Sequence, residues 1–395
     1  MDLLSGFVHS PTMIRIALLG STGSIGRQCL DLAQRMPDRI QVVGLGAGTN
    51  IERLADQAKQ FRPRLVSCAK PDDLDTLRQL IGDPTIEVAA GDDGQIALAT
   101  LSEVDTVVAA VVGYAGLVGT LAAAKQGKRI ALANKESLVA AGELVIEHLS
   151  QSQGSIIPID SEHAAIHQCL RGEHADSVHK LWLTASGGPF RGATRQQLET
   201  ITVEQALNHP NWSMGPKITV DSATLMNKGL ELIEATWLFD CSPTDIEIAV
   251  HPPSIVHSMV EFVDGSFKAQ LGAPDMRAAI AYALSPDERL PLRSVNGVRL
   301  WNPLDSRLVF EPYDRELFRG PDLCREALRL GGGAPAALNA MNEVLVAQFL
   351  NEERSFLSIS EKLEHGLNEL SQLQLPGNSI EAIIHADSVG RAWAQ

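Results

Sequence analysis

Cysteine is scarce in this chain, which has five cysteines among 395 residues. They are odd in number, lie far apart and never form a Cys-x-x-Cys pair, which argues against a zinc site and against a disulfide framework. Cysteine usage of this kind is typical of a reducing compartment. We therefore expect the protein in the cytoplasm.

Long hydrophobic runs and basic clusters are missing as well. No stretch of about 18 apolar residues occurs, so no segment is expected to span a membrane. The net charge is −15 and there is no block of Lys or Arg, which argues against nucleic acid and anionic membranes as partners. Residues 1–12 lack the features of a signal or transit peptide, and Met13 is an alternative start. A small molecule is the expected ligand.

The pattern of short β-branched runs and amphipathic stretches divides the chain. Apolar residues make up 45% of it, enough for more than one core, because single cores stop growing at about 250–300 residues. In residues 1–160 the alternation predicts a parallel sheet with helices on both faces. The expected strands are Ile14–Leu19, Ile40–Leu45, Leu65–Cys68, Thr106–Val111, Arg129–Ala133 and Ser155–Ile159.

The remainder predicts two further domains. Residues 161–290 read as an α+β domain with a hairpin that turns at Asp264-Gly265. A linker at 291–311 leads to a helical domain at 312–395, with helices expected at Gly320–Leu330, Ala336–Leu350 and Ser360–Leu373. The expected fold class is therefore α/β: an N-terminal Rossmann-like parallel sheet, a central α+β catalytic domain and a C-terminal helical bundle.

A glycine-rich turn, Gly20-Ser21-Thr22-Gly23-Ser24-Ile25-Gly26, follows the first expected strand. Such turns let a pyrophosphate approach the backbone at a helix N-terminus, although about half of them are only turns. Its place in a first βαβ unit favours a dinucleotide. The second strand leads into Ala47-Gly48-Thr49-Asn50, without an acid for the ribose hydroxyls, which favours NADP over NAD.

Carboxylates follow the last expected strand, in Pro158-Ile159-Asp160-Ser161-Glu162-His163. If strand geometry continues, Asp160 and Glu162 project the same way at the ligand-binding edge of the sheet. With Glu231 they would offer oxygen ligands suited to Mg²⁺ or Mn²⁺. The alternative is that Asp160 only caps a helix.

The segment Asp221–Glu231 combines a helix cap with polar side chains. Asp221 or Ser222 is expected to cap a helix that continues to about Phe239, leaving backbone N–H groups for an anion. Asn227, Lys228 and Glu231 would share one face of it. The plainer alternative is an amphipathic helix with an internal Lys228–Glu231 pair.

Two other segments are candidates for ligand contact. Lys135, at the end of the fifth expected strand, can meet an anionic substrate, though a solvated lysine at a helix start is nearly as common. Asn208–Lys217 places Trp212 and Met214 among turn-forming residues and is expected to be a lid; otherwise Trp212 packs into the core. Ser186, before Gly187-Gly188-Pro189, offers another hydroxyl.

Together these motifs resemble one family, the 1-deoxy-D-xylulose 5-phosphate reductoisomerases. Besides the segments above, the resemblance includes Ser186–Phe190, His209–Gly215, His251–Val260, Leu271–Arg277, Pro312–Asp314 and Ala337–Glu343, in the family's order and over nearly the whole chain. It implies NADPH- and metal-dependent conversion of 1-deoxy-D-xylulose 5-phosphate to 2-C-methyl-D-erythritol 4-phosphate, a step of non-mevalonate isoprenoid precursor biosynthesis. The metal would be Mg²⁺ or Mn²⁺, with Co²⁺ as an alternative, and the assembly a homodimer.

The resemblance also implies roles for individual residues. Catalysis would involve Lys135, Glu162 and His209, and the metal would be held by Asp160, Glu162 and Glu231. Some family members carry a basic residue where this chain has Thr49, which would weaken the hold on the 2′-phosphate. NADPH would contact Thr22, Gly23, Ser24, Ile25, Gly48, Asn50, Asn134, Glu136 and Gly215, and substrate would contact Lys135, Ser161, Glu162, Ser186, His209, Ser222, Asn227, Lys228 and Glu231.

Two other functions are weaker hypotheses. A dehydrogenase of the aspartate-semialdehyde type would share the glycine turn but needs a nucleophilic cysteine with a histidine partner, and no cysteine here has an evident activating neighbour. A non-catalytic NADP sensor would have no use for three clustered carboxylates.

Overall fold

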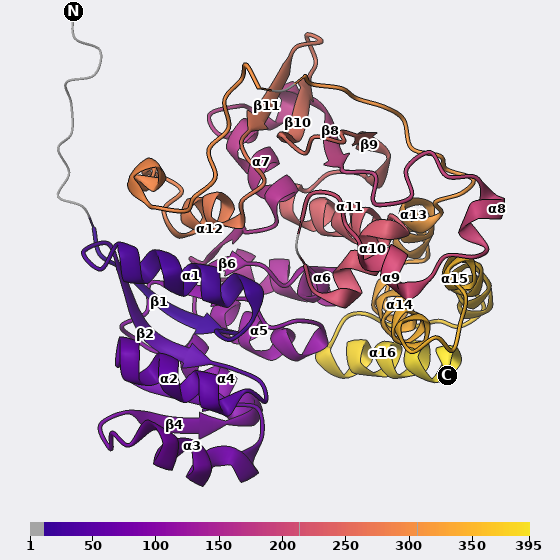
Figure 1. Ribbon diagram of the computed structural model, residues 1–395. Coiled ribbons are helices and arrows are strands. Elements are labelled where there is room, and N and C mark those ends of the chain that lie inside the picture. Colours follow the sequence, from indigo (N-terminus) through magenta and orange to yellow (C-terminus); the bar gives the residue numbers. More distant parts are fainter. Residues whose placement is uncertain (1–11, 213, 306) are drawn as a thin grey trace, which may run out of the picture.

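A seven-stranded parallel sheet forms the N-terminal part of the computed structural model, which describes residues 12–212, 214–305 and 307–395 (Figure 1). The strand order is β4-β3-β2-β1-β5-β6-β7. All six expected strands are confirmed, with ends that differ by at most two residues. The strands are β1 (Ile14–Leu19), β2 (Ile40–Gly46), β3 (Leu65–Cys68), β4 (Glu87–Ala90), β5 (Thr106–Ala109), β6 (Arg129–Leu132) and β7 (Ser155–Pro158).

Helices cover both faces of this sheet. Buried residues of α1, α2 and α12 pack together on one face, while those of α4, α5 and α6 pack on the other. The helices are α1 (Ser24–Arg35), α2 (Ile51–Phe61), α3 (Leu74–Ile81), α4 (Gly91–Ala99), α5 (Leu117–Lys125), α6 (Lys135–Ser150) and α12 (Met276–Leu284). Helix α12 comes from the central part of the chain, and its packing against α1 connects that part to the parallel sheet.

The central part is built on a four-stranded sheet in the order β11-β10-β8-β9. The expected hairpin is confirmed, since β10 and β11 pair antiparallel. The strands are β8 (Val178–Ala185), β9 (Ile246–Val250), β10 (Val256–Phe262) and β11 (Phe267–Leu271), and the helices are α7 (Ser161–Leu170), α8 (Arg195–Leu198), α9 (Val203–Leu207), α10 (Pro216–Ala223) and α11 (Met226–Phe239).

The expected single helix from Ser222 to Phe239 is wrong, because the chain breaks between α10 and α11. Leu225 has a left-handed backbone with φ 56°, and the Thr224 hydroxyl accepts a hydrogen bond from Met226 N. Asp221 and Ser222 therefore lie in the last turn of α10 and cap no helix. Helix α10 begins instead after Gly215, with Pro216 in its first turn.

The C-terminal part consists of helices, as expected, and packs against α10 and α11 (Figure 1). Helix α16 was not expected, and the others start or end up to four residues from their predicted bounds. They are α13 (Gly320–Leu330), α14 (Ala334–Leu350), α15 (Phe356–Leu370) and α16 (Ile380–Ala394). Short 3-10 turns lie at Pro71–Asp73, Tyr114–Gly116, Ala175–Ser177, Pro243–Asp245 and Leu292–Ser294. Within the described ranges, no helix is both long and apolar enough to cross a membrane.

Helix α11 lies directly against α13, and the close approach depends on glycine. A Cβ atom on Gly229 would lie 2.6 Å from the Gly320 carbonyl oxygen and 2.7 Å from Cys324 Sγ. We expect Gly229→Ala to lower the free energy of unfolding by about 1–3 kcal/mol, because the backbone of α13 must move to admit a methyl group. Urea unfolding measures the effect, with Lys59→Ala on the exposed face of α2 as control. An unchanged midpoint for Gly229→Ala would contradict the predicted overlap.

Candidate active site

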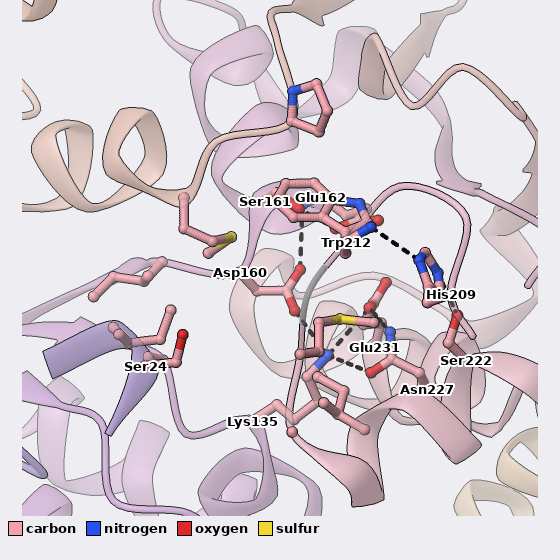
Figure 2. A pocket seen from close by; sticks show the side chains of 18 of the residues that line it. Ser24, Lys135, Asp160, Ser161, Glu162, His209, Trp212, Ser222, Asn227 and Glu231 are labelled. Atoms are coloured by element: carbon pink, nitrogen blue, oxygen red, sulfur yellow. Dashed lines mark hydrogen bonds and ion pairs between the residues drawn. The ribbon is translucent and has the colours of Figure 1, made fainter. Parts of the chain in front are cut away.

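A cavity of about 900 Å³ opens between the carboxyl edge of the parallel sheet and the central domain. Figure 2 shows side chains from distant segments of the chain converging on it. It brings together sixteen of the predicted site residues: Gly23, Ser24, Ile25, Asn134, Lys135, Glu136, Asp160, Ser161, Glu162, Ser186, His209, Gly215, Ser222, Asn227, Lys228 and Glu231.

The predicted carboxylates form one cluster. Ligand atoms of Asp160, Glu162 and Glu231 all lie within 4.8 Å of one another. The expected reason was wrong in part, because strand geometry ends at Pro158. Asp160 caps α7 by accepting a hydrogen bond from Glu162 N at 3.2 Å, so the first turn of a helix, and not a strand, brings the two acids together. The capping alternative and the cluster therefore both hold.

Two buried lysines form ion pairs with this cluster. Lys135 Nζ lies 2.8 Å from Asp160 Oδ2 and 3.1 Å from Glu231 Oε1. Lys228 Nζ lies 2.8 Å from Glu162 Oε1 and also contacts Glu231. Burial by itself lowers the pKa of Lys135, but the Asp160 and Glu231 carboxylates outweigh burial and raise that pKa above its ordinary value. Lys135 is therefore a cation of the site and not a solvated lysine.

The Lys228–Glu231 pair expected within one helix is present, but it does not belong to a solvent-exposed face. Both side chains are buried, at 4% and 1% exposure. Burial and then Glu231 raise the pKa of Glu162 to about 7, and the Ser161 hydroxyl donates to Glu162 Oε2 at 2.6 Å. The cluster is thus an interior set of charges that depends on its own pairing.

Behind the cluster lies a pair that the sequence did not indicate, His163 and Glu234. His163 Nε2 donates to the main-chain carbonyl of Glu231 at 2.8 Å. Its Nδ1 lies 3.2 Å from Asp160 Oδ1 and 3.3 Å from Glu234 Oε2. Burial opposes protonation, but Glu234 and then Asp160 raise the pKa of His163 to about 9. Spacing three residues from Glu231 was the one available signal for Glu234.

A second polar group faces the cavity from the other side, formed by His209 and two serines. His209 Nε2 lies 3.0 Å from Ser186 Oγ and 3.1 Å from Ser222 Oγ. Its Nδ1 accepts hydrogen bonds from two main-chain N–H groups, those of Asn211 and Trp212. The Nε2 atom must therefore carry the proton of a neutral ring, and burial lowers the pKa of His209 accordingly. The single Nε2–H is shared between the two hydroxyl oxygens, which leaves both hydroxyl protons free to be donated to an anion.

Trp212 lines the cavity and does not pack into the core, which supports the lid interpretation of its segment. Its ring lies 6.4 Å from that of His257. Asn211 anchors the segment by donating from Nδ2 to Pro252 O and to Ser254 Oγ, both at 2.7 Å. Ser213, inside the same segment, lies outside the described residues.

The glycine turn has the geometry expected for a close backbone approach. Gly20 has φ 92°, and a Cβ on Gly26 would lie 2.3 Å from the Gly20 carbonyl oxygen. The Ser21 hydroxyl donates to Gln57 Oε1 at 2.6 Å, which ties the turn to α2. No side chain caps α1 at Gly23, and Gly23, Ser24 and Ile25, at the start of this helix, line the cavity.

Three predicted cofactor residues do not line this cavity: Thr22, Gly48 and Asn50. Gly48 and Asn50 follow β2, where Asn50 caps α2 by accepting from Arg53 N at 3.1 Å. A Cβ on Gly48 would meet no atom within 4 Å. Gly48 and Asn50 are both exposed at this neighbouring strand end.

The fold and site together define an α/β protein whose parallel sheet opens onto a cavity lined by a glycine turn and a cluster of three carboxylates. Comparison with known families agrees: residues 16–142 match the 1-deoxy-D-xylulose 5-phosphate reductoisomerase family, and residues 156–239 and 271–393 match its two C-terminal domains. The chain belongs to this family.

Relatives with this name match along almost their full length. The protein from Lachnospira eligens is 46% identical over 377 residues, covering 95% of this chain and 98% of its own. That from Trichlorobacter lovleyi is 47% identical, covering 97% of each chain. Among solved structures, a DOX-P reductoisomerase in complex with NADPH, fosmidomycin and magnesium has 42% identity and a TM-score of 0.90, covering 97% of each chain. The Zymomonas mobilis enzyme in complex with NADPH has 40% identity and a TM-score of 0.89, also covering 97% of each chain.

The buried His257 predicts a pH dependence of stability. Burial lowers its pKa from 6.5 to about 4, so between these values the unfolded chain binds a proton that the folded chain does not. Stability must then fall as the pH falls. Between about pH 7.5 and about pH 5 we expect this group alone to lower the free energy of unfolding by about 2 kcal/mol. Urea unfolding at both pH values measures it, and His257→Gln should remove this part of the decrease. Equal decreases in both proteins would refute the assignment.

Proposed function

We propose that the protein converts 1-deoxy-D-xylulose 5-phosphate into 2-C-methyl-D-erythritol 4-phosphate, by rearrangement of the carbon skeleton followed by reduction with NADPH. One observation carries this proposal. A single cavity is lined by a glycine turn at a helix start, a cluster of three carboxylates and two serine hydroxyls beside a histidine. A dehydrogenase that only transfers hydride to a simple carbonyl would need no metal cluster.

We infer that Asp160, Glu162 and Glu231 hold a divalent cation. The donor set is three carboxylates without cysteine or a histidine ligand, which suits Mg²⁺ or Mn²⁺, with Co²⁺ as an alternative. Such an ion, when bound, polarises a carbonyl oxygen and stabilises the negative charge that develops on it. The Lys135 ammonium, already among these carboxylates, would donate to a substrate oxygen at the same end, and Glu162 and Ser161 would contact the substrate hydroxyls there.

At the other end of the cavity, Ser186 and Ser222 would donate their hydroxyl protons to the substrate phosphate. His209 keeps both hydroxyls oriented, because its Nε2–H faces their oxygens. Asn227 and Lys228, at the start of α11, would extend this anion site toward the carboxylates. Holding the phosphate lets remote binding energy orient the reacting carbons, and the segment with Trp212 would cover the bound substrate.

NADPH is proposed to bind across the carboxyl edge of the parallel sheet. Its phosphates would lie against the turn at Thr22, Gly23, Ser24 and Ile25, and its nicotinamide end near Asn134, Glu136 and Gly215. Gly48 and Asn50 would then contact the adenosine part at the end of β2. No acid occupies residues 47–50, which supports NADPH over NADH.

We also propose a homodimer in the cytoplasm. β11 is an edge strand with exposed Phe267 and Leu271, and the segment 300–310 exposes Leu304 at 91% and Phe310 at 43%. Large apolar side chains on an edge strand favour pairing across a twofold axis. The five cysteines are all free, as in a reducing compartment. The domain boundaries at residues 160, 290 and 311 stay predictions.

The metal cluster gives the first test of this function. Asp160→Asn and Glu231→Gln should each lower turnover of 1-deoxy-D-xylulose 5-phosphate by more than about a hundredfold. Changes to residues that only support a metal's ligands already cost about tenfold to a hundredfold, and these two residues are proposed to be ligands themselves. NADPH oxidation at 340 nm measures it, and titration of NADPH fluorescence should give nearly unchanged cofactor binding. Glu199→Gln, an exposed acid, is the matched control. Full activity of either variant at saturating Mg²⁺ would overturn the metal assignment.

Cofactor choice gives a second test. Hydrogen bonds to a charged group contribute about 1.5–3 kcal/mol each, so kcat/KM with NADPH should exceed that with NADH at least tenfold even without a basic residue at position 49. Thr49→Lys should lower KM for NADPH and leave KM for NADH unchanged, because only NADPH carries the 2′-phosphate. Equal efficiency with both cofactors, or an equal change for both, would speak against the proposed site.

A further inference from the structure

A chain of polar side chains, Glu136, Lys217, Asp221 and Asn342, links three helices next to the cavity. Of these four, only Glu136 has a role in the function proposed above. Asp221, in α10, is 1% exposed. Its Oδ2 lies 2.9 Å from Lys217 Nζ, and its Oδ1 accepts a hydrogen bond from Asn342 Nδ2, on α14, at 2.8 Å. The same Lys217 Nζ lies 3.5 Å from Glu136 Oε1, in the first turn of α6.

Two members of this polar chain, Glu136 and Asp221, lie beside segments that are proposed to bind a ligand. Glu136 and its neighbour Asn134 border the proposed nicotinamide end of NADPH, and Asn134 Nδ2 lies 3.2 Å from Glu136 Oε2. Asp221 directly precedes Ser222, whose hydroxyl faces the proposed phosphate site. Lys217 is itself the last residue of the lid segment and lies in the first turn of α10. The Lys217 ammonium group therefore contacts Glu136, beside the proposed cofactor site, and Asp221 of α10, beside the proposed phosphate site.

The chain also gives the C-terminal helices a connection to the site. Among the described residues, those that line the cavity end at Arg299, so the helical domain contributes no side chain to it. Asn342, which is 0% exposed, reaches the substrate helix through Asp221. The Asn342–Asp221 hydrogen bond holds α10 against α14, and the Lys217–Glu136 ion pair holds α10 against α6.

Stability alone does not explain these charges. Burial opposes the charge of Lys217, yet Asp221 and then Glu136 outweigh it and raise the pKa of Lys217. Buried ion pairs are often replaceable by apolar residues of similar size without loss of stability. An apolar side chain at position 217 could not pair with both Glu136 and Asp221. It therefore could not transmit a movement of one carboxylate to the other.

We propose that Lys217 is a positioning residue that couples the two ligand sites, so that NADPH bound at the Glu136 segment strengthens binding of the phosphorylated ligand beside Ser222, and the reverse. The inference rests on the proposed function. NADPH that fixes Glu136 also fixes the Lys217 ammonium, and Lys217 then holds Asp221, Ser222 and the end of the lid in the binding arrangement. Because linkage is reciprocal, each ligand must change the affinity for the other by the same factor.

The test is the ratio of NADPH dissociation constants measured without and with saturating 2-C-methyl-D-erythritol 4-phosphate and Mg²⁺. NADPH and this product do not react with each other, so NADPH fluorescence reports equilibrium binding. In the wild-type protein we expect the ratio to be about fivefold or more, in the range usual for coupled sites. Lys217→Met keeps the side-chain stem, removes the charge, and should bring the ratio close to one.

Three further variants separate coupling from folding. Lys217→Arg should restore most of the ratio, because it returns a cation. Asn342→Leu, which releases Asp221 from α14, should lower the ratio if Lys217→Met does not fold. Lys180→Met is the matched control, since Lys180 forms a 2.7 Å ion pair with Glu247 outside the cavity lining, and it should leave the ratio unchanged.

The outcomes distinguish this inference from the proposed function. A wild-type ratio of one, or a wild-type ratio retained by folded Lys217→Met, overturns the coupling role. Turnover of 1-deoxy-D-xylulose 5-phosphate by the same wild-type preparation tests the function itself. An active wild-type enzyme with uncoupled sites would therefore reject the inference alone, whereas an inactive one would reject the function.

Discussion

The arrangement of the site depends on five charges buried together, the carboxylates of Asp160, Glu162 and Glu231 and the ammonium groups of Lys135 and Lys228. Removing one partner of a buried ion pair leaves an uncompensated charge and costs about 3–5 kcal/mol. Neither the acids nor the lysines are therefore stable in this interior without the other set. Because the five side chains come from α6, α7 and α11, their mutual pairing fixes these three helices relative to one another.

The parallel sheet supplies most of this convergence. β6 and β7 are neighbours, so the helices that follow them, α6 and α7, begin side by side at the same edge. Asn134 and Asp160 cap those two helices, and the residues just after each cap, Lys135 and Glu162, then face the same cavity. Only Lys228 and Glu231 must come from elsewhere, on helix α11, which is held by its close packing against α13.

Much of the fold could be predicted because its signals are local. Apolar runs predicted most of the parallel sheet, whereas β4 was missed because Glu87–Ala90 is short, lies at the sheet edge and contains one β-branched residue. Asp160 and Glu162 could be found from their place after a strand. Their meeting with Glu231 could not, because about seventy residues separate them and tertiary packing brings them together.

The predictions that failed share one physical cause: the type of a residue does not determine its place in the tertiary structure. Asp221 and Ser222 have the composition of a helix cap, yet they lie in the last turn of α10, because the left-handed backbone at Leu225 separates α10 from α11. Glu234 follows Glu231 at the spacing of a solvent-exposed face, yet its carboxylate is 1% exposed and is directed toward His163.

The placement of these charged and polar side chains gives the cavity two chemically different ends, or poles. Carboxylates that would ordinarily face water form the proposed cation site at one end. At the other end His209, held neutral by two main-chain donors, leaves the hydroxyls of Ser186 and Ser222 free to bind an anion. Asn227 lies between these poles, accepting from Lys135 Nζ at 2.8 Å. A ligand with a phosphate at one end and oxygen atoms that chelate a metal at the other matches both poles at once, whereas a simple phosphate or a simple hydroxyketone would satisfy only one of them.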